Sequence, residues 1–336
     1  MQTSRTQKKT LLIGSAILVL AALLALCLLG GCTQQPGQSG TDTTNSQDSQ
    51  TGEFSYTFTD DLGYDVEVTS IDRVVACMGS FANTWELAGG TLVGVTQDAL
   101  DDYTLDSPDV AVVGDFTAPN LEAIIALQPD FVIMTGAATG KDGAANQVDL
   151  REGLQASGIP VAYFNVTTFD DYLRMLRTCC DITGREDLYV QNGASVESTI
   201  DALKAKVPAG EAPTVLLMTT YSGGTRVQNS STMTGTMLAE LGAKNLADEY
   251  PSLLKDFSLE SVIDMNPDFI LVVPMGNDSA AAMKNLEDAT ADNPAWATLD
   301  AVKDNRYITL DPKLFQYKPN AEWATSYQTL FDILYS

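Results

Sequence analysis

The body of the chain carries one pattern of apolar and polar positions twice. Residues 120–134 (NLEAIIALQPDFVIM) align without a gap with residues 258–272 (SLESVIDMNPDFILV), 138 positions further on, and six positions are identical. In each copy a polar residue precedes a short apolar stripe with helical spacing, a Pro-Asp pair ends the helix, and a run typical of a buried strand follows. A helix-Pro-Asp-strand unit that occurs twice predicts two similar α/β lobes rather than one long sheet.

Short apolar runs alternate with helical patterns on both sides of this repeat, which is typical of parallel sheets. We therefore expect an α/β fold of two Rossmann-like lobes, residues 54–168 and 208–336, with mainly parallel sheets. The expected strands are 73–78, 92–96, 110–113, 131–134 and 159–164 in the first lobe and 214–219, 269–273 and 305–310 in the second. The expected helices within the lobes include 81–88, 234–241 and a terminal helix over 321–335.

A long helical stretch separates the two lobes. Residues 169–207 are predicted to be helical over most of their length, with an interruption at Thr183-Gly184. We expect this segment to join the lobes as a long rigid helix, with the ligand cleft between them. Because packed helices resist hinge motion more than paired strand linkers do, closure on ligand binding should be limited.

The N-terminus has a different pattern. Residues 11–29 form an almost uninterrupted apolar run after a basic flank, and the run ends in Leu29-Gly30-Gly31-Cys32. Leu-Gly-Gly-Cys resembles the bacterial lipobox, in which cleavage precedes a cysteine that carries the lipid. We expect residues 1–31 to be a lipoprotein signal peptide and Cys32 to be lipidated. A retained membrane span is the alternative, since about 20 apolar residues cross a bilayer. Both place the body outside the cytoplasm.

The segment after Cys32 lacks the means to form a core. Residues 33–53 contain no aliphatic or aromatic side chain and are rich in Gln, Ser, Thr and Gly. Ordering such a segment cannot be offset by apolar burial. We therefore expect residues 32–53 to be a flexible tether that holds the body on the outer face of the cytoplasmic membrane.

Composition excludes several classes of function. Without the three cations of the signal peptide, 16 of the 19 basic residues remain against all 44 acidic ones, a net charge of −28. Such a surface repels nucleic-acid phosphates. The chain has no histidine, which excludes His-ligated zinc, Ser-His-Asp and Cys-His catalysis, and imidazole ligation of haem.

Two further features have ordinary structural interpretations. Cys77, Cys179 and Cys180 remain after loss of the signal and lipidation, and we expect three buried thiols, leaving open whether the adjacent pair is oxidised. The acid pairs Asp60-Asp61 and Asp101-Asp102 are predicted to be solvated turns, since neighbours in sequence do not converge on one substrate as glycoside hydrolysis requires. No catalytic residue is assigned.

The order of motifs over about residues 54–336 resembles a family, the substrate-binding lipoproteins of ABC importers for iron-siderophore complexes, haem and cobalamin. The resemblance is carried by RVVACMGSFANTWELAGGTLVGVT (73–96), the two repeat segments, TMLAELGAKNLAD (236–248) and NPAWATLDAVKDNRYITLD (293–311). It implies a helix-joined fold, a ligand held between the lobes and no enzymatic activity. It also implies a ferric siderophore as ligand, with haem or cobalamin as alternatives on the same scaffold, and no intrinsic cofactor.

Ligands of α/β lobes sit at the carboxyl ends of the strands, so candidate contacts lie in the loops that follow them. We rank Arg226 first, because it lies in a polar Gly-containing segment and an anionic chelate favours a charge-assisted fork. Aromatic rings can form a wall against a planar ligand, and thioethers can contact it. Core packing is the favoured interpretation of Trp323. The candidate ligand contacts are Met78, Ser80, Phe116, Thr135, Lys141, Tyr221, Arg226, Met275, Tyr317 and Lys318.

The resemblance further implies one glutamate on each lobe that docks into arginine pockets of the permease. Glu122 matches the family position in NLE. Glu240, in TMLAELGAK, stands one residue closer to the glycine than the commonest spacing. The implied partners are the ABC permease, through it the ATPase, and the membrane via the lipid anchor; we expect a monomer that binds no nucleic acid. An exported enzyme and a scaffold lipoprotein are the competing hypotheses.

Overall fold

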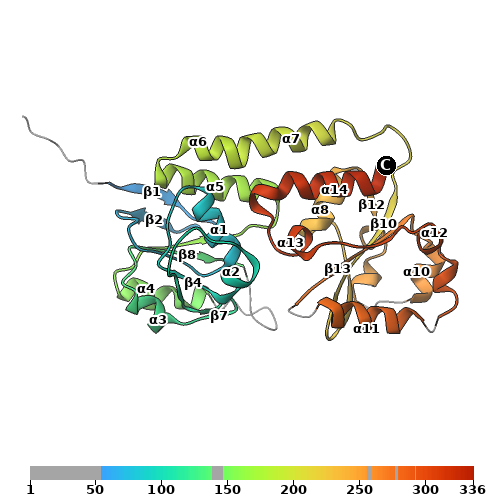
Figure 1. Cartoon of the computed structure of the whole chain (residues 1–336), viewed down its shortest axis with the longest axis horizontal. Coiled ribbons are helices and arrows are strands. Elements are labelled where there is room, and N and C mark those ends of the chain that lie inside the picture. Colours follow the sequence, from blue (N-terminus) through green and yellow to red (C-terminus); the bar gives the residue numbers. More distant parts are fainter. Residues whose placement is uncertain (1–53, 138–146, 256–258, 277–278, 292) are drawn as a thin grey trace, which may run out of the picture. The chain divides into compact units, whose positions relative to one another are not determined.

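Two separate five-stranded sheets organise the computed structural model, which describes residues 54–137, 147–255, 259–276, 279–291 and 293–336 (Figure 1). We call the first sheet with its helices the N-terminal lobe and the second with its helices the C-terminal lobe. Residues 52–336 form one compact unit. No helix among the described residues is both long and apolar enough to cross a membrane.

The first sheet is parallel throughout, in the order β5-β4-β3-β8-β9. Its central strands are buried on both faces, which explains why their sequences are continuous apolar runs rather than alternating ones. All five expected strands are present. Their bounds are Val74–Ala76 (β3), Gly94–Val95 (β4), Ala111–Val112 (β5), Phe131–Thr135 (β8) and Val161–Phe164 (β9). The helices of this lobe are Gly79–Leu87 (α1), Gln97–Asp102 (α2), Leu121–Ala126 (α3) and Arg151–Ala156 (α4).

The second sheet has the order β11-β10-β13-β14, with β12 also paired to β10, and only β11 runs antiparallel. Its strands are Thr214–Tyr221 (β10), Gly224–Gln228 (β11), Lys244–Asn245 (β12), Phe269–Pro274 (β13) and Tyr307–Thr309 (β14). Its helices are Met233–Glu240 (α8), Leu246–Glu249 (α9), Leu259–Met265 (α10), Ser279–Ala291 (α11), Asp300–Lys303 (α12) and Pro312–Phe315 (α13).

The two copies of the repeat lie in different sheets, α3 before β8 and α10 before β13, which confirms two lobes. The residue before each proline, Gln128 or Asn266, has a positive φ. The aspartate after each proline binds the start of the neighbouring strand. Asp130 accepts from the Arg73 N–H, just before β3, at 3.0 Å, and Asp268 accepts from the Thr214 N–H, at the start of β10, at 2.8 Å. The repeated Pro-Asp therefore ends a helix and fixes the neighbouring strand.

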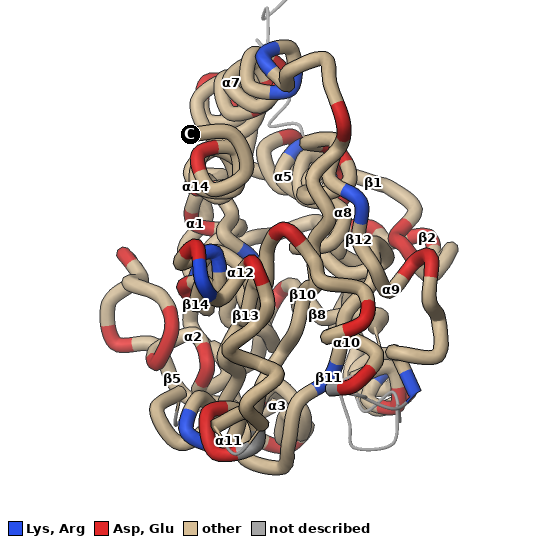
Figure 2. The backbone as a smooth tube through the Cα atoms, turned by 90° about the vertical axis from the view of Figure 1, so that its right-hand side faces the viewer, with Lys and Arg blue, Asp and Glu red and all other residues tan. Residues whose placement is uncertain are grey.

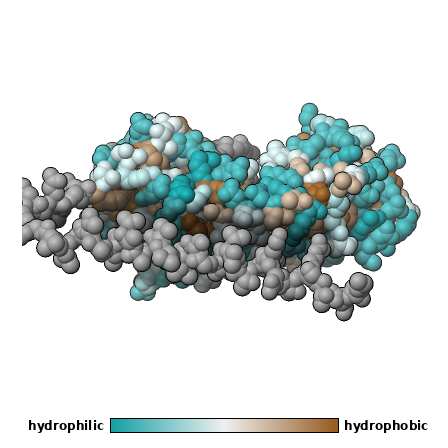
Figure 3. Space-filling view, turned by 90° about the horizontal axis from the view of Figure 1, so that it is seen from above, coloured by the Kyte–Doolittle hydropathy of each residue, from teal (hydrophilic) through white to brown (hydrophobic). Residues whose placement is uncertain are grey.

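The connecting segment is helical but bends back on itself. It consists of α5 (Phe169–Thr183), α6 (Glu186–Tyr189), a π-helical turn (Val190–Ala194) and α7 (Ser195–Lys204). Gly184 ends α5 in the left-handed conformation, φ 70°, so the expected interruption is confirmed. The terminal helix α14 (Trp323–Tyr335) packs along α7 (Figure 1). The face that carries these helices is mostly hydrophilic, with small hydrophobic groups (Figure 3).

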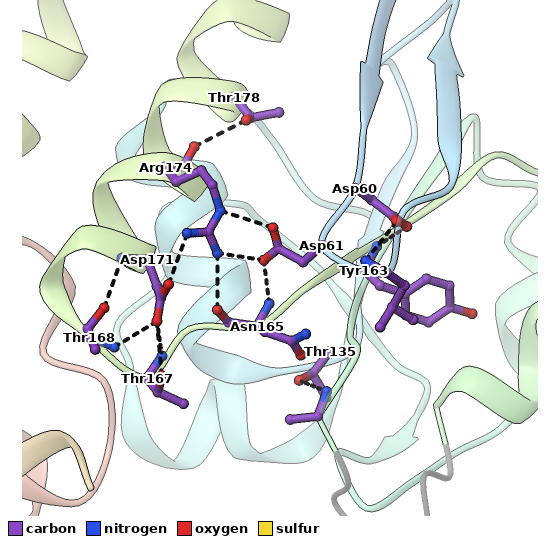
Figure 4. Close-up of polar contacts among 12 residues, drawn as sticks. Asp60, Asp61, Thr135, Tyr163, Asn165, Thr167, Thr168, Asp171, Arg174 and Thr178 are labelled. Atoms are coloured by element: carbon purple, nitrogen blue, oxygen red, sulfur yellow. Dashed lines mark hydrogen bonds and ion pairs between the residues drawn. The ribbon is translucent and has the colours of Figure 1, made fainter. Parts of the chain in front are cut away.

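A hairpin of Tyr56–Thr59 (β1) and Asp65–Val68 (β2) precedes the first sheet and was not expected from the sequence. Asp60 in its turn is 6% exposed and accepts from the Tyr163 N–H at 3.1 Å. Asp61 pairs with Arg174 of α5 at 2.8 Å and accepts from the Asn165 N–H (Figure 4). The expected turn is present, but the expectation that it is solvated is wrong, because its carboxylates attach the hairpin to β9 and α5.

The core confirms two further expectations. Cys77, Cys179 and Cys180 are buried free thiols. Trp323 is 1% exposed, and its ring lies 5.8 Å from that of Phe169. The largest apolar cluster continues from the N-terminal lobe through α5, α7 and α14 into the C-terminal lobe. The joint between the lobes is therefore packed rather than open.

Candidate functional site

A cavity of about 450 Å³ lies where residues of both lobes meet. In parallel sheets the carboxyl ends of the strands share one edge, and ligands bind there. Met78 follows β3, and Met275 follows β13. The lining residues are Met78, Ser80, Gln97, Asp98, Asp101, Asp102, Tyr103, Asp115, Phe116, Thr117, Met275, Gly276, Gln316, Tyr317 and Lys318.

Apolar and hydrogen-bonding groups face each other across this cavity. Phe116 comes from the tight connection between β6 (Gly114–Asp115) and β7 (Ala118–Pro119). Met275, also in the lining, is a large apolar side chain that is 40% exposed. Ser80 is 4% exposed, and its hydroxyl has no hydrogen-bond partner among the described residues. Apolar walls with a few convergent polar groups are typical of small-molecule sites.

Gln147 fixes the N-terminal wall of the cavity. Its side chain is fully buried; Nε2 donates to the backbone oxygens of Cys77 and Phe116, at 2.7 and 2.6 Å, and Oε1 accepts from the Thr135 N–H at 2.9 Å. One amide thus joins the ends of β3 and β8 to the loop that carries Phe116. Three satisfied hydrogen bonds on a buried amide hold that loop in one position.

The segment that provides Tyr317 and Lys318 is attached to the N-terminal lobe. The Tyr103 hydroxyl donates to the Lys318 backbone oxygen at 3.0 Å. Asn320, two residues on, donates to the Ser80 backbone oxygen at 2.9 Å. These two hydrogen bonds hold the segment with Tyr317 and Lys318 against Tyr103 and Ser80 of the N-terminal lobe without any ligand.

Two smaller hollows adjoin the cavity. One of about 370 Å³ shares Asp102, Tyr103, Tyr317 and Lys318 with it, and one of about 170 Å³ shares Met275 and Gln316. The second is lined by residues of the C-terminal lobe, among them residues of β10 and β13. Because the three hollows share lining residues, a ligand too large for the central cavity can extend into the two beside it.

Six of the ten candidate ligand contacts line this one cavity. They are Met78, Ser80, Phe116, Met275, Tyr317 and Lys318. Thr135 is buried behind it, and its hydroxyl accepts from the Ala137 N–H at 3.1 Å. Lys141 and Cys32, the predicted lipidation site, lie outside the described residues.

Arg226 and Tyr221 occupy a different place. Arg226 is on strand β11 rather than in a loop, opposite Thr219, and its guanidinium carbon lies 5.3 Å from the centre of the Tyr221 ring. Because β11 turns back antiparallel after Ser222-Gly223, Arg226 is drawn away from the carboxyl edge of the sheet. Neither side chain lines the cavity, and their role in binding stays a prediction.

The two glutamates predicted to dock on the permease differ in their surroundings. Glu122 is exposed in the first turn of α3, with no side-chain partner among the described residues. The Glu240 carboxylate pairs with Lys204 of α7 and accepts from the Tyr327 hydroxyl of α14 at 2.7 Å. A permease arginine would therefore have to displace two internal partners at Glu240 and none at Glu122.

Sequence reasoning missed several residues of the site, four of which show why. Gln147 and Asn320 act through contacts distant in sequence, and no local pattern marks them. Asp101 and Asp102 are in helix α2 and line the cavity, so their expected place in a solvated turn is wrong. The two acids follow Asp98 at one-turn spacing, and that helical periodicity was the available signal.

The fold and this cavity together define a two-lobed binding protein, and the family comparison agrees. The periplasmic binding protein family matches residues 74–314. The chain belongs to that family, whose members are substrate-binding proteins of ABC importers for iron-siderophore complexes, haem and vitamin B12. It is a binding protein of the extracytoplasmic space and not an enzyme.

Individual relatives are distant. The chain is 25% identical over 300 residues to the Fe(3+)-citrate-binding protein YfmC of Bacillus subtilis, covering 88% of this chain and 89% of that protein. Among solved structures, Staphylococcus aureus SirA complexed with staphyloferrin B has a TM-score of 0.63 at 22% identity, over 83% of this chain and 97% of that one. S. aureus IsdE complexed with heme has a TM-score of 0.63 at 18% identity, over 79% and 99%. These likenesses establish the fold of the described body.

Proposed function

We propose that this chain is the extracytoplasmic substrate-binding lipoprotein of an ABC importer that captures an iron-siderophore complex and delivers it to the permease. The observation that carries the proposal is the 450 Å³ cavity, where Met78, Ser80 and Phe116 of one lobe meet Met275, Tyr317 and Lys318. Relatives named for ferric citrate and siderophore complexes support an iron complex as cargo.

The arrangement can grip an organic envelope without supplying iron ligands. Phe116 and Tyr317 provide ring faces for the organic shell of a chelate. The Ser80 hydroxyl, which makes no hydrogen bond of good geometry with the described residues, provides a hydrogen bond to a polar group of that shell. The iron enters already chelated, so recognition acts on the shape and charge of the chelate.

Anchoring and docking complete the proposal. Cys32 carries the lipid, residues 33–53 allow the body to reach the permease, and Glu122 provides one docking contact. The exposed, unpartnered carboxylate of Glu122 supports this role. Labelling with radioactive palmitate, with loss of label in Cys32→Ala, tests the anchor.

Haem is the second candidate, because thioethers of Met78 and Met275 and the phenol of Tyr317 line the cavity. Methionine and tyrosine side chains are known haem ligands. An absorption band in the Soret region of the purified protein supports haem, and a band typical of a ferric siderophore supports the first candidate.

Equilibrium dialysis with radioactive iron complexes tests the function. We expect saturable binding of a ferric siderophore without turnover. Phe116→Ala and Tyr317→Ala should each weaken it about 10-fold or more, since buried aromatic anchors dominate such sites. Tyr250→Ala is the matched control, because Tyr250 is 45% exposed and outside the cavity. If the protein bound none of the iron complexes and neither haemin nor cobalamin, the proposal would be contradicted.

A further inference from the structure

The charged side chains that line the cavity are nearly all acidic. Asp98, Asp101 and Asp102 come from helix α2, and Asp115 comes from β6 (Figure 2 shows the acidic positions of α2). Among the residues that the structure describes, Lys318 is the one basic residue in the lining. The formal charge of the lining is therefore negative, whereas the sequence alone suggested a cation for an anionic chelate.

Contacts within the protein neutralise only part of this charge. Asp98 accepts from the Gly79 N–H at 2.6 Å, at the start of α1, and Asp101 accepts from Gln97 at 2.9 Å. Asp102 and Asp115 have neither a hydrogen-bond nor an ion-pair partner among the described residues, and Lys318 does not pair with either of them. Two carboxylates are left to interact with whatever enters the cavity.

Neighbouring groups respond to the same negative field. Burial, then Asp98 and Asp101, raise the pKa of Asp102, and the nearby Lys313 offsets only part of that rise. Burial and Asp102 raise the pKa of the Tyr317 phenol. Burial lowers the pKa of Lys318, and Asp98 offsets only part of that effect. Extra negative charge is unfavourable at this site, and positive charge is favourable.

Ser80 provides an observation independent of the acids. Its side chain is 4% exposed in the same lining, and its hydroxyl lies near the Tyr103 phenol but makes no hydrogen bond of good geometry within the described protein. A buried hydroxyl without a partner costs free energy unless a ligand satisfies it. This uncharged group, together with Phe116 and Met275, marks the cavity as a site built for a ligand rather than an incidental acidic surface.

We propose that the cavity selects iron(III) complexes by charge, so that a cationic complex binds most tightly, a neutral one less tightly and an anionic one weakest. The proposal rests on the function proposed above and adds the chemical class of its ligand. Asp102 and Asp115 are the specificity-determining residues, because their carboxylates are the ones left without protein partners. Ferric citrate, named for the relative from B. subtilis, is anionic, so the two proteins are expected to prefer different ligands.

One chelate scaffold with three charges tests this directly. Ferrioxamine B, a ferric trihydroxamate with a free amine, is monocationic; acetylation of the amine makes it neutral, and succinylation makes it monoanionic. In equilibrium dialysis at low salt, we expect about a 10-fold loss of affinity at each step. The differences should shrink as salt is added, because screening weakens interactions between exposed charges.

Variants assign the selectivity to named carboxylates. Asp102→Asn and Asp115→Asn should each weaken the monocationic complex several-fold and leave the neutral one nearly unchanged. Asp201→Asn is the matched control, because Asp201 is an exposed aspartate of α7 outside the cavity and the variant changes net charge equally. Equal losses for the cationic and neutral complexes indicate a structural role and overturn the assignment.

The panel also contains ferric enterobactin, ferric citrate and haemin. Tightest binding of any of these anionic compounds, or equal affinity for the three ferrioxamine forms, overturns the charge selection while the proposed function stands. Absence of binding across the whole panel contradicts the proposed function itself. The two failures are therefore distinguishable in one experiment.

Discussion

The side-chain amide of Asn320 donates a hydrogen bond of 2.9 Å to the backbone oxygen of Ser80, 240 residues earlier in the chain. The same nitrogen donates to Asn83 Oδ1 at 2.8 Å. Asn320 is 2% exposed and has a φ of 51°, a conformation that asparagine tolerates better than most residues. This contact joins the segment before α14 to the helix that begins beside the cavity.

Asn320→Ala should lower the free energy of unfolding by about 2 kcal/mol, because it removes two hydrogen bonds and leaves a buried backbone oxygen unsatisfied. Urea denaturation measures the change. Asn305→Ala is the matched control: Asn305 has a φ of 58°, is exposed, and its side chain makes no hydrogen bond with the described residues. If both variants lowered the free energy of unfolding equally, the loss would come from the backbone conformation at these positions and not from the contact with Ser80.

Gln147→Met should weaken ligand binding about 10-fold or more, because it keeps the volume but releases the Phe116 loop from β3 and β8. Isothermal titration calorimetry measures the affinity for the ligand, and circular dichroism checks that the variant is folded. Gln155→Met is the control, since Gln155 is exposed on α4. Unchanged affinity in a folded Gln147 variant would show that Phe116 does not need this support.

Acid should weaken the attachment of α5. Burial opposes ionisation of Asp171, but hydrogen bonds from Arg174, Thr167 and Thr168 lower its pKa to about 2 (Figure 4). A lowered folded-state pKa gives stability that is complete above the ordinary value near 4 and disappears as the pH falls through about 2. Because solvent screens this partly exposed carboxylate, Asp171→Asn should cost about 1 kcal/mol at pH 7, less than the full pKa shift corresponds to, and progressively less below pH 4.

Denaturation across this pH range measures the difference. Asp187→Asn serves as the control, because Asp187 pairs with Arg185 on the surface, where ion pairs contribute little. A cost for Asp171→Asn that stays constant from pH 7 to pH 2 would refute the linkage.

Glu122→Ala should reduce uptake of labelled iron complex by cells while ligand affinity and stability stay unchanged. Glu152→Ala, another exposed acid in the first turn of a helix, should leave uptake normal. Glu240→Ala should instead lower the free energy of unfolding by about 2 kcal/mol, since Lys204 and the Tyr327 hydroxyl lose their partner. Normal uptake in Glu122→Ala argues against docking through this residue.

The packed joint predicts little closure when ligand binds. An apolar cluster continues through α5, α7 and α14 into both lobes, and such cores resist continuous deformation. Small-angle X-ray scattering of free and loaded protein should give radii of gyration within about 1 Å of each other. Compaction by several ångströms would show that the helices bend or slide.

The sequence was sufficient to predict the lobes because the information was local. The strands β8 and β13 are buried on both faces, so they appear as unbroken apolar runs, and the proline before each marks the end of a helix. The site was harder. Met78 and Met275 were found because they follow strands, but most of the charge of the cavity comes from α2, whose Asp101-Asp102 pair was taken for a turn.

Arg226 shows why the rest could not be predicted. The glycines before it suggested a loop, whereas Ser222-Gly223 forms a two-residue hairpin connection and the chain returns as β11. A hairpin and a loop have similar composition, and only the pairing of Thr219 with Arg226 distinguishes them. Gln147 and Asn320 depend in the same way on contacts that exist only in the folded protein.

The location of iron tests the central claim most directly. Crystals grown with the tightest-binding ferric complex of the panel, measured at the iron absorption edge, give an anomalous difference peak at the metal. The account predicts that peak inside the cavity bounded by Met78, Phe116, Met275 and Tyr317. A peak outside this cavity, beside Arg226 for example, would contradict it.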